Sequence, residues 1–346
     1  MTAPLRIGVI GAGALGYHHV RLFRDVTGAT LVGFHDARPE RAAQVASELS
    51  VQPFDSVDAL VDACDALTIA VPTPAHHAVA KAALARGRHL LIEKPLAASL
   101  DEADEMLAIA TRAGALIQTG HVERFNRAVR AALPFVEAPR FIDSDRLAPF
   151  NPRGSDVAVV LDLMIHDIDL VLTLVGSHVS DVAAVGVPVL TPFVDIANAR
   201  VVFDSGVVAN ITSSRVSRER MRKVRIFQQS GYMSLDLAAG TGEFYRLRGD
   251  LDLAALAKGP LALEAFVERI RLDAPDGEPL RLEFESFVAA VRGAQPVVVS
   301  GEDGREALAV ALRIVKEIER TLPSLAGAGQ AAKAEGIVRA GTGARA

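Results

Sequence analysis

Strand-like apolar runs alternate with amphipathic stretches over the first third of the chain. The runs are short enough for the strands of a buried parallel sheet, and they lie at Leu5–Ile10, Thr30–Phe34, Ala66–Val71, His89–Ile92 and Ala115–Gln118. Helical spacing of apolar residues follows the first run, recurs over 38–49 and 75–86, and begins again after the N-cap pair Ser99 and Glu102. This alternation predicts a doubly wound parallel sheet in an α/β domain over residues 1–120.

The pattern changes after residue 120. Helices are predicted over 126–136 and over the apolar stretch 157–175. Strand-like segments separated by turn signals then follow at 182–189, 196–204, 207–214, 222–229 and 232–237. Successive strands predict a large, mainly antiparallel sheet, which helices at 282–292 and 305–321 would complete as an α+β domain over 121–325. Residues 326–346 lack apolar periodicity and predict a mobile tail.

Composition indicates a soluble globular protein with two domains. One core rarely grows beyond roughly 250 residues, and this chain has 346, of which 50% are hydrophobic and 23% charged. The single cysteine, Cys64, cannot form an internal disulfide, and the first residues show no signal-peptide pattern, so we expect a cytoplasmic protein. The net charge of −5 argues against nucleic acid and anionic membrane as partners. The stretch 157–175 has nearly the length of a membrane span, but its central charged residues favour a buried helix.

A glycine-rich turn follows the first predicted strand and opens the first helix. It consists of Gly11, Ala12, Gly13, Ala14, Leu15 and Gly16, in the pattern G-x-G-x-x-G. In this context, such a turn brings backbone amides close to the pyrophosphate of a dinucleotide. Asp36 lies 20 residues beyond Gly16, where a carboxylate accepts hydrogen bonds from ribose hydroxyls, so NAD is favoured. Arg38 and Arg41 could each pair with a 2′-phosphate, so NADP is disfavoured but stays open.

Two further segments carry candidate chemistry. Lys94 ends a predicted strand in the sequence IEKPLA, at the sheet edge where α/β proteins bind ligands. Asp162, His166 and Asp169 fall at spacings of four and three in the apolar helix, which places them on one face. A buried polar stripe needs partners, and a structural Asp–His pair is the alternative to a catalytic one. Two ligands are too few for a metal site, so none is predicted.

The segments GAGALG, VPTPAHH, IEKPLA, GHVERFN and DLMIH together resemble the glucose-fructose oxidoreductase and inositol dehydrogenase family, over residues 5–320. The resemblance implies a Rossmann domain followed by a domain with a large, mainly antiparallel sheet. It implies that Lys94 is the active-site lysine and that Asp162 and His166 form the family's Asp-x-x-x-His pair. It further implies cofactor contacts from Pro72, Thr73, His76 and Glu93, and substrate or cofactor contacts from His121, Arg124 and Asn126.

The implied reaction is oxidation of a secondary hydroxyl of a sugar. His166 would act as general base, Asp162 would orient it or hold a substrate hydroxyl, and Lys94 would stabilise the developing alkoxide. Within the family, the resemblance favours the branch that oxidises the 3-hydroxyl of UDP-N-acetylglucosamine. Inositol or a free aldose as substrate, an NAD-dependent glycosidase, and a non-catalytic NAD(H) sensor are the alternatives.

The basic run 215–225 is either a solvated face or an anion site at the edge of the substrate cleft, and Arg215 is its candidate substrate ligand. A homodimer or homotetramer is expected from the family resemblance.

Overall fold

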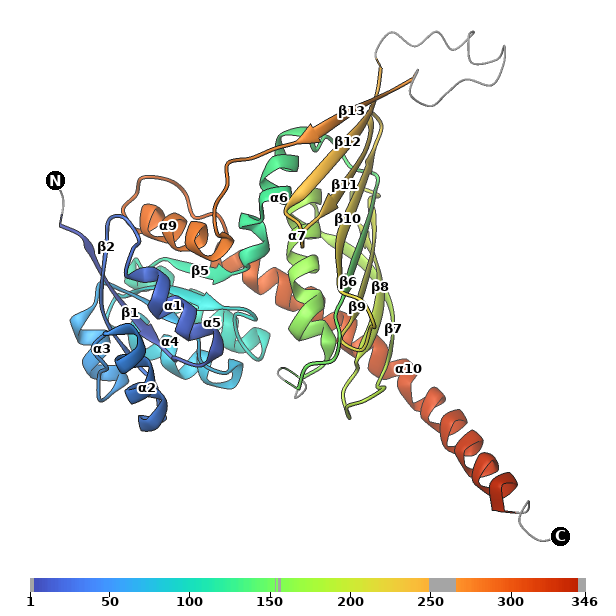
Figure 1. The fold of residues 1–346 in the computed structure, drawn as a ribbon, viewed down its shortest axis with the longest axis horizontal. Helices are drawn as coiled ribbons and strands as arrows, with labels where there is room; N and C mark the ends of the chain where they lie inside the picture. Colours follow the sequence, from blue (N-terminus) through green and yellow to red (C-terminus); the bar gives the residue numbers. More distant parts are fainter. Residues whose placement is uncertain (1–2, 153, 155–156, 249–265, 342–346) are drawn as a thin grey trace.

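The computed structural model describes residues 3–152, 154, 157–248 and 266–341, and two sheets organise it (Figure 1). The first sheet has the strand order β2-β1-β3-β4-β5, and all its neighbouring strands are parallel. Its strands are β1 (Leu5–Ile10), β2 (Ala29–His35), β3 (Ala66–Ile69), β4 (His89–Glu93) and β5 (Ile117–Gly120). The connecting helices are α1 (Ala14–Phe23), α2 (Pro39–Leu49), α3 (Val57–Ala63), α4 (His76–Leu84) and α5 (Leu100–Ala113). The predicted doubly wound sheet is confirmed, and its order switches between β1 and β3, where such sheets bind ligands.

The second sheet has eight strands in the order β13-β12-β11-β10-β6-β9-β8-β7. They are β6 (Phe141–Leu147), β7 (Val179–Val187), β8 (Ile196–Phe203), β9 (Val208–Ser214), β10 (Met221–Gln228), β11 (Gly231–Asp236), β12 (Thr241–Leu247) and β13 (Val267–Leu272). Neighbours are antiparallel except β6 and β9, which are parallel. The mainly antiparallel sheet is therefore confirmed, while β6, β12 and β13 were missed by the sequence analysis.

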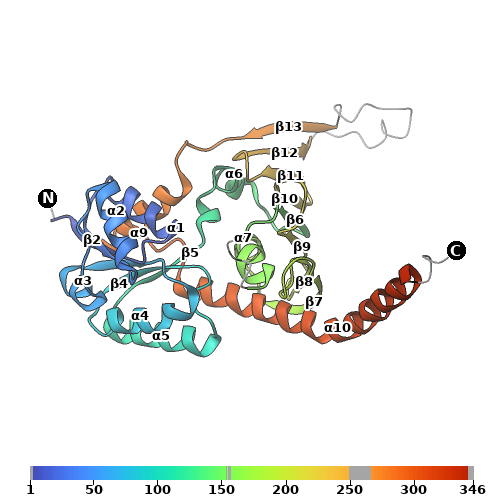
Figure 2. The ribbon, with the colours of Figure 1, turned by 60° about the horizontal axis from the view of Figure 1, so that its bottom comes forward.

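Helices cover one face of the second sheet. These are α6 (Arg127–Ala132), the π-helical segment η4 (Val160–Met164), α7 (Ile165–Val175) and the first half of α10 (Gly301–Gly341). In β8 the burial alternates residue by residue, so one face joins this core and the other is open. Figure 2 shows the helices on one side of the second sheet, and α10 starting near β5 and running beneath the second sheet.

Helix α9 (Pro279–Val291) corrects the sequence analysis, which assigned 282–292 to the second domain. Its Phe284 and Phe287 are fully buried in the core of the parallel sheet, and Phe284 stacks on Phe23 of α1 with ring centroids 4.1 Å apart. Helix α10 contacts both cores, through Leu308 on one side and Ile314 on the other. The last part of the chain therefore completes the first sheet as well as the second.

Helix α10 also extends through much of the segment for which a mobile tail is predicted. The backbone is helical to Gly341, and 342–346 lie outside the described residues. No helix within the described part of the chain is both long enough and apolar enough to cross a membrane.

Candidate active site

In the glycine turn between β1 and α1, two of the three glycines are required by the fold and the third is not. A Cβ atom at Gly16 would lie 1.9 Å from the Gly11 carbonyl oxygen, so helix and turn can approach only because residue 16 has no side chain. Gly11 itself has φ +90° and adjoins the Ala70 backbone. At Gly13, by contrast, the nearest atom to an added Cβ is Arg38 Nη2 at 3.9 Å. The fold does not require Gly13 to be glycine, which fits a backbone kept bare for a ligand.

Asp36, at the end of β2, faces this turn. Its carboxylate accepts hydrogen bonds from the backbone amides of Ala12 (2.9 Å) and Arg38 (3.0 Å), and Arg38 Nε pairs with it at 3.1 Å. Burial alone would raise the pKa of Asp36, but these Arg38 and Ala12 contacts hold it below its usual value. Arg41 Nε donates to the Ala12 carbonyl at 2.7 Å and braces the turn. Because α1 has no side-chain cap at Gly13, its first amides remain available, and the whole arrangement fits the adenosine diphosphate part of NAD.

The loops after β3 and β4 divide into exposed and internal residues. Pro72 is exposed and Thr73 partly buried at the carboxyl edge of the sheet, as a cofactor contact requires. His76 is buried, with its two ring nitrogens at 3.0 Å from the Pro95 carbonyl and 2.9 Å from the Val71 carbonyl. It therefore joins the two loops, and the expectation that it touches cofactor directly is corrected to a positioning role.

Glu93 is also internal. Its Oε1 lies 3.0 Å from His19 Nε2, and His19 Nδ1 lies 2.7 Å from Thr68 Oγ1. Burial would raise the pKa of Glu93, but His19 and then Lys94 hold it below its usual value. The carboxylate connects α1 to the end of β4, so direct cofactor contact gives way to support of Lys94, the next residue.

Lys94 and Asp162 meet although 68 residues separate them. Lys94 Nζ donates to the backbone carbonyl of Asp162 at 2.6 Å and lies 3.5 Å from its Oδ1. Desolvation lowers the pKa of Lys94, while Asp162 and Glu93 oppose that shift. The amine from the parallel sheet and the carboxylate from η4 thus lie side by side, and their joint role in a site stays a prediction.

His166 lies beside this pair, one turn further along the helix. The pKa of its imidazole is well below the usual value because the ring is desolvated and because Lys94 and Arg146 are positively charged neighbours. Its Nδ1 is buried without a hydrogen-bond partner among the described residues. A neutral imidazole beside an ammonium and a carboxylate can accept a proton and hold a hydroxyl in place. The expected regular helix is replaced at Val160–Met164 by a π-helical turn, a feature frequent at functional sites.

Of four further predicted substrate residues, three have internal hydrogen-bond partners and one, His121, has none among the described residues. Arg124 forms a two-pronged ion pair with Asp169, at 2.9 and 2.7 Å, which accounts for the third member of the predicted stripe. The Asn126 amide donates to Glu123 and to the Leu237 carbonyl, and its oxygen caps α6. His121 is fully buried, with its ring centroid 6.4 Å from that of His166. For Arg124 and Asn126 the expectation of substrate contact is corrected, because internal partners occupy their polar groups. Both ring nitrogens of His121 are buried without a hydrogen-bond partner among the described residues, so its contact with substrate stays a prediction.

Arg215 is the fourth. Its side chain is 4% exposed and donates to the carbonyls of Gly154 and Val157, the latter at 2.6 Å. Gly154 in turn adjoins the Asp162 carboxylate, since a Cβ added there would lie 2.7 Å from Oδ2. The guanidinium therefore fastens the chain next to Asp162 and is not open to a substrate.

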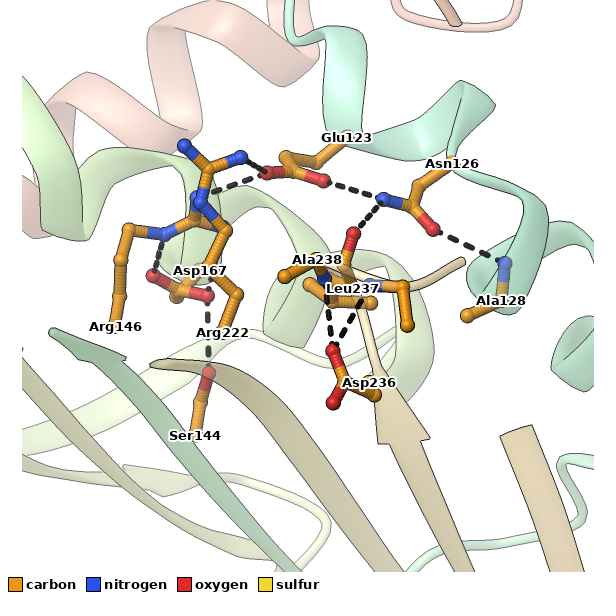
Figure 3. Close-up of polar contacts among 11 residues, drawn as sticks. Glu123, Asn126, Ala128, Ser144, Arg146, Asp167, Arg222, Asp236, Leu237 and Ala238 are labelled. Atoms are coloured by element: carbon orange, nitrogen blue, oxygen red, sulfur yellow. Dashed lines mark hydrogen bonds and ion pairs between the residues drawn. The ribbon is translucent and has the colours of Figure 1, made fainter. Parts of the chain in front are cut away.

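The sequence analysis missed a charged cluster beside His166 (Figure 3). Arg146 of β6 binds Asp167 Oδ2 at 2.6 Å and Glu123 Oε1 at 2.8 Å, and Ser144 donates to Asp167. Arg222 of β10 lies 3.5 Å from the same Glu123 oxygen. The sequence indicated this cluster only through the many charged residues in DLMIHDIDL and in the basic run 215–225. Neither segment shows which arginine pairs with which carboxylate.

Comparison with known proteins agrees with this geometry. Residues 5–121 match the oxidoreductase family with an NAD-binding Rossmann fold, and 127–234 match the Gfo/Idh/MocA C-terminal domain. The chain is 39% identical to UDP-N-acetylglucosamine 3-dehydrogenase of Acidithiobacillus ferrooxidans, covering 92% of this chain and 98% of that one. A solved structure of that enzyme has a TM-score of 0.84 and covers 93% and 100% of the two chains at 38% identity. Myo-inositol 2-dehydrogenase of Thermotoga maritima is 27% identical over 91% and 96%. The chain therefore belongs to the Gfo/Idh/MocA family of NAD-binding oxidoreductases.

Proposed function

We propose that this oxidoreductase uses NAD to oxidise the 3-hydroxyl of UDP-N-acetylglucosamine to the 3-keto sugar. The observation that carries the chemistry is the convergence of Lys94, Asp162 and His166 at the carboxyl edge of the parallel sheet. The choice of sugar is supported by the similarity to the Acidithiobacillus ferrooxidans enzyme, which extends over 92% of the chain.

The roles follow from the protonation states of the three side chains. Residues 11–16, Asp36 and the Pro72–Thr73 loop would hold NAD, which would supply the acceptor for the hydride of the carbinol carbon. His166 accepts the hydroxyl proton, because its depressed pKa keeps the ring neutral at pH 7. Lys94 places positive charge beside the developing alkoxide, and Asp162 holds both the amine and a substrate hydroxyl.

Asp36 is the residue proposed to select NAD over NADP. Its carboxylate is fixed by Ala12 and Arg38 at the end of β2, where a 2′-phosphate would meet its negative charge. Arg38 is 66% exposed but already paired with Asp36. We therefore expect Asp36→Ser to narrow the preference for NADH, measured as the ratio of NADH and NADPH dissociation constants.

The test starts with the nucleotide that copurifies with the protein, identified after denaturation. The holoenzyme is then incubated with UDP-N-acetylglucosamine, other UDP-sugars, free hexoses and inositols while NADH absorbance is followed. We expect turnover of the UDP-sugar, with His166→Asn lowering kcat by about 100- to 10,000-fold and the exposed control His178→Asn leaving it unchanged. Exclusive turnover of inositol or a free aldose, release of sugar without accumulated NADH, or binding without turnover would each refute the assignment.

We also propose that the open face of the second sheet joins copies of the chain into a dimer or tetramer. Aromatic rings form a continuous row across it, from Phe141 to Phe227, Tyr232 and Tyr245, with centroids 4.8–5.6 Å apart. An exposed aromatic row on a sheet face is typical of an interaction surface. Light scattering of the wild type and of Tyr232→Glu tests the assembly.

The buried, unpaired Cys64 supports the proposal of a cytoplasmic location.

A further inference from the structure

Two arginines stand directly opposite each other in the second sheet. In the antiparallel pairing of β6 and β10, Arg146 is the register partner of Arg222. Like charges at directly opposed positions destabilise a sheet unless other charges offset them. The pair therefore needs negative charge close to both guanidinium groups, and the neighbouring carboxylates supply it unequally.

The carboxylates serve Arg146 far better than Arg222. Arg146 is 4% exposed and takes both Asp167, at 2.6 Å, and Glu123, at 2.8 Å. Arg222 has only a longer contact with the same Glu123 oxygen, at 3.5 Å, and its side chain is 42% exposed. Its other N–H groups have no hydrogen-bond partner among the described residues, so the guanidinium keeps donors available to a ligand. Figure 3 shows both arginines reaching toward the one Glu123 carboxylate.

Arg222 is partly removed from water and has charged neighbours of both signs. The pKa of Arg222 lies below the usual value of an arginine. Desolvation is the main cause, the positive charges of Arg146 and Arg220 lower the pKa further, and Glu123 opposes the shift. Arg222 is therefore a partly desolvated cation whose nearest carboxylate oxygen, on Glu123, lies at 3.5 Å and is already bonded to Arg146. A bound anion would supply the close charged hydrogen bonds that this longer contact does not provide.

The cluster is also next to the reacting groups. Asp167, which binds Arg146, follows His166 in the chain, and both Arg146 and Arg222 contribute to the depressed pKa of His166. Arg222 is thus close enough to His166 to affect its pKa, and its side chain is 42% exposed. For a sugar with its hydroxyl at His166, Arg222 is a nearby cation to which an anionic substituent would be attracted.

We propose that Arg222, supported by Arg146 and Glu123, binds the diphosphate of the nucleotide-sugar substrate. The proposal rests on the proposed function and assigns the anion-binding role to Arg222 rather than to Arg215, whose guanidinium is enclosed. A guanidinium fork suits phosphate oxygens, and Arg146 and Glu123 hold it in place from behind.

The test measures binding without turnover. UDP is titrated by calorimetry into protein saturated with NADH, so that UDP cannot occupy the cofactor site. Arg222→Met removes the guanidinium and relieves the like-charge pair, so the fold should be retained, which circular dichroism checks. The matched control is Arg225→Met, on the same strand but on the open face, where Arg225 pairs with Asp143.

We expect Arg222→Met to weaken UDP binding by about 10- to 100-fold, the range for a lost charged hydrogen bond, with NADH affinity unchanged. Arg222→Lys should recover part of the loss, and Arg225→Met should bind UDP as the wild type does. With UDP-N-acetylglucosamine as substrate, the KM of Arg222→Met should rise and kcat should stay close to that of the wild type. Equal UDP affinity in Arg222→Met and wild type, or no UDP binding by the wild type, overturns the inference. The substrate panel decides the proposed function separately, since that result depends on which sugar is turned over.

Discussion

Gly13 and Gly16 allow the demands of the fold to be separated from those of the cofactor. Both belong to the G-x-G-x-x-G turn, and each can be changed to alanine. In Gly16→Ala the new Cβ would lie 1.9 Å from the Gly11 carbonyl oxygen, so helix α1 or the turn must move. Overpacking of this kind costs about 1–3 kcal/mol of stability. In Gly13→Ala the nearest atom lies 3.9 Å away, so the expected change in stability is within about 0.5 kcal/mol.

Although Gly13→Ala should hardly change stability, it should weaken cofactor binding. A methyl group at the bare position meets the approaching pyrophosphate, and we expect NADH to bind at least about tenfold more weakly, or about 1.4 kcal/mol. Urea unfolding followed by circular dichroism gives the stability. NADH fluorescence gives the affinity, without background from tryptophan, which the chain lacks. The reasoning would be refuted if Gly13→Ala proved as unstable as Gly16→Ala, or if it folded normally and bound NADH with unchanged affinity.

Three further predictions concern charge at the junction of the sheets. The positive charge of Lys94 depresses the pKa of His166, so Lys94→Met should move the acid limb of the kcat/KM profile to higher pH, whatever the loss in rate. Arg124→Met leaves the buried Asp169 unpaired and should cost about 3–5 kcal/mol in urea unfolding, most of which Arg124→Met combined with Asp169→Leu should restore. Glu283 is fully buried without a side-chain partner among the described residues, and burial raises its pKa well above the usual value. The folded state therefore loses stability as pH rises above the pKa of the unfolded chain, and Glu283→Leu should raise Tm more at pH 8 than at pH 5.

The sequence predicts elements well where one local signal decides them. The five strands of the parallel sheet and the Ser99 cap of α5, whose hydroxyl accepts from the Glu102 amide, follow from local pattern. Helix α9 shows the limit, because its apolar face could complete either sheet. Its tertiary contacts, among them the stacking of Phe284 on Phe23, place it on the first. Periodicity predicts that one face of a helix is buried. Which other element that face packs against depends on tertiary contacts.

The candidate site shows the same division. The spacing of Asp162 and His166, the setting of Lys94 and the family resemblance predict these three residues as a site, and the structure brings Lys94 and Asp162 into contact. From the sequence, Arg124 and Arg215 could not be distinguished from substrate-binding residues, because nothing local shows whether a guanidinium binds a group of its own chain or a ligand. Asp169, Gly154 and Val157 are the partners that decide the matter, and they lie 45 to 61 residues away in the chain.

The distance between Lys94 and Asp162 depends on contacts that never meet the reacting carbon. Lys94 is fixed by the parallel sheet and Asp162 by η4 on the second sheet, so a shift of one sheet against the other changes their 3.5 Å approach. The Arg124–Asp169 pair ties the end of the first sheet to α7, and α10 is buried against both cores. A misplacement of about 1 Å can lower a rate about 100-fold. We therefore expect the charged side chains enclosed at the junction, such as Arg124 and Asp169, to affect catalysis by keeping the two sheets in place.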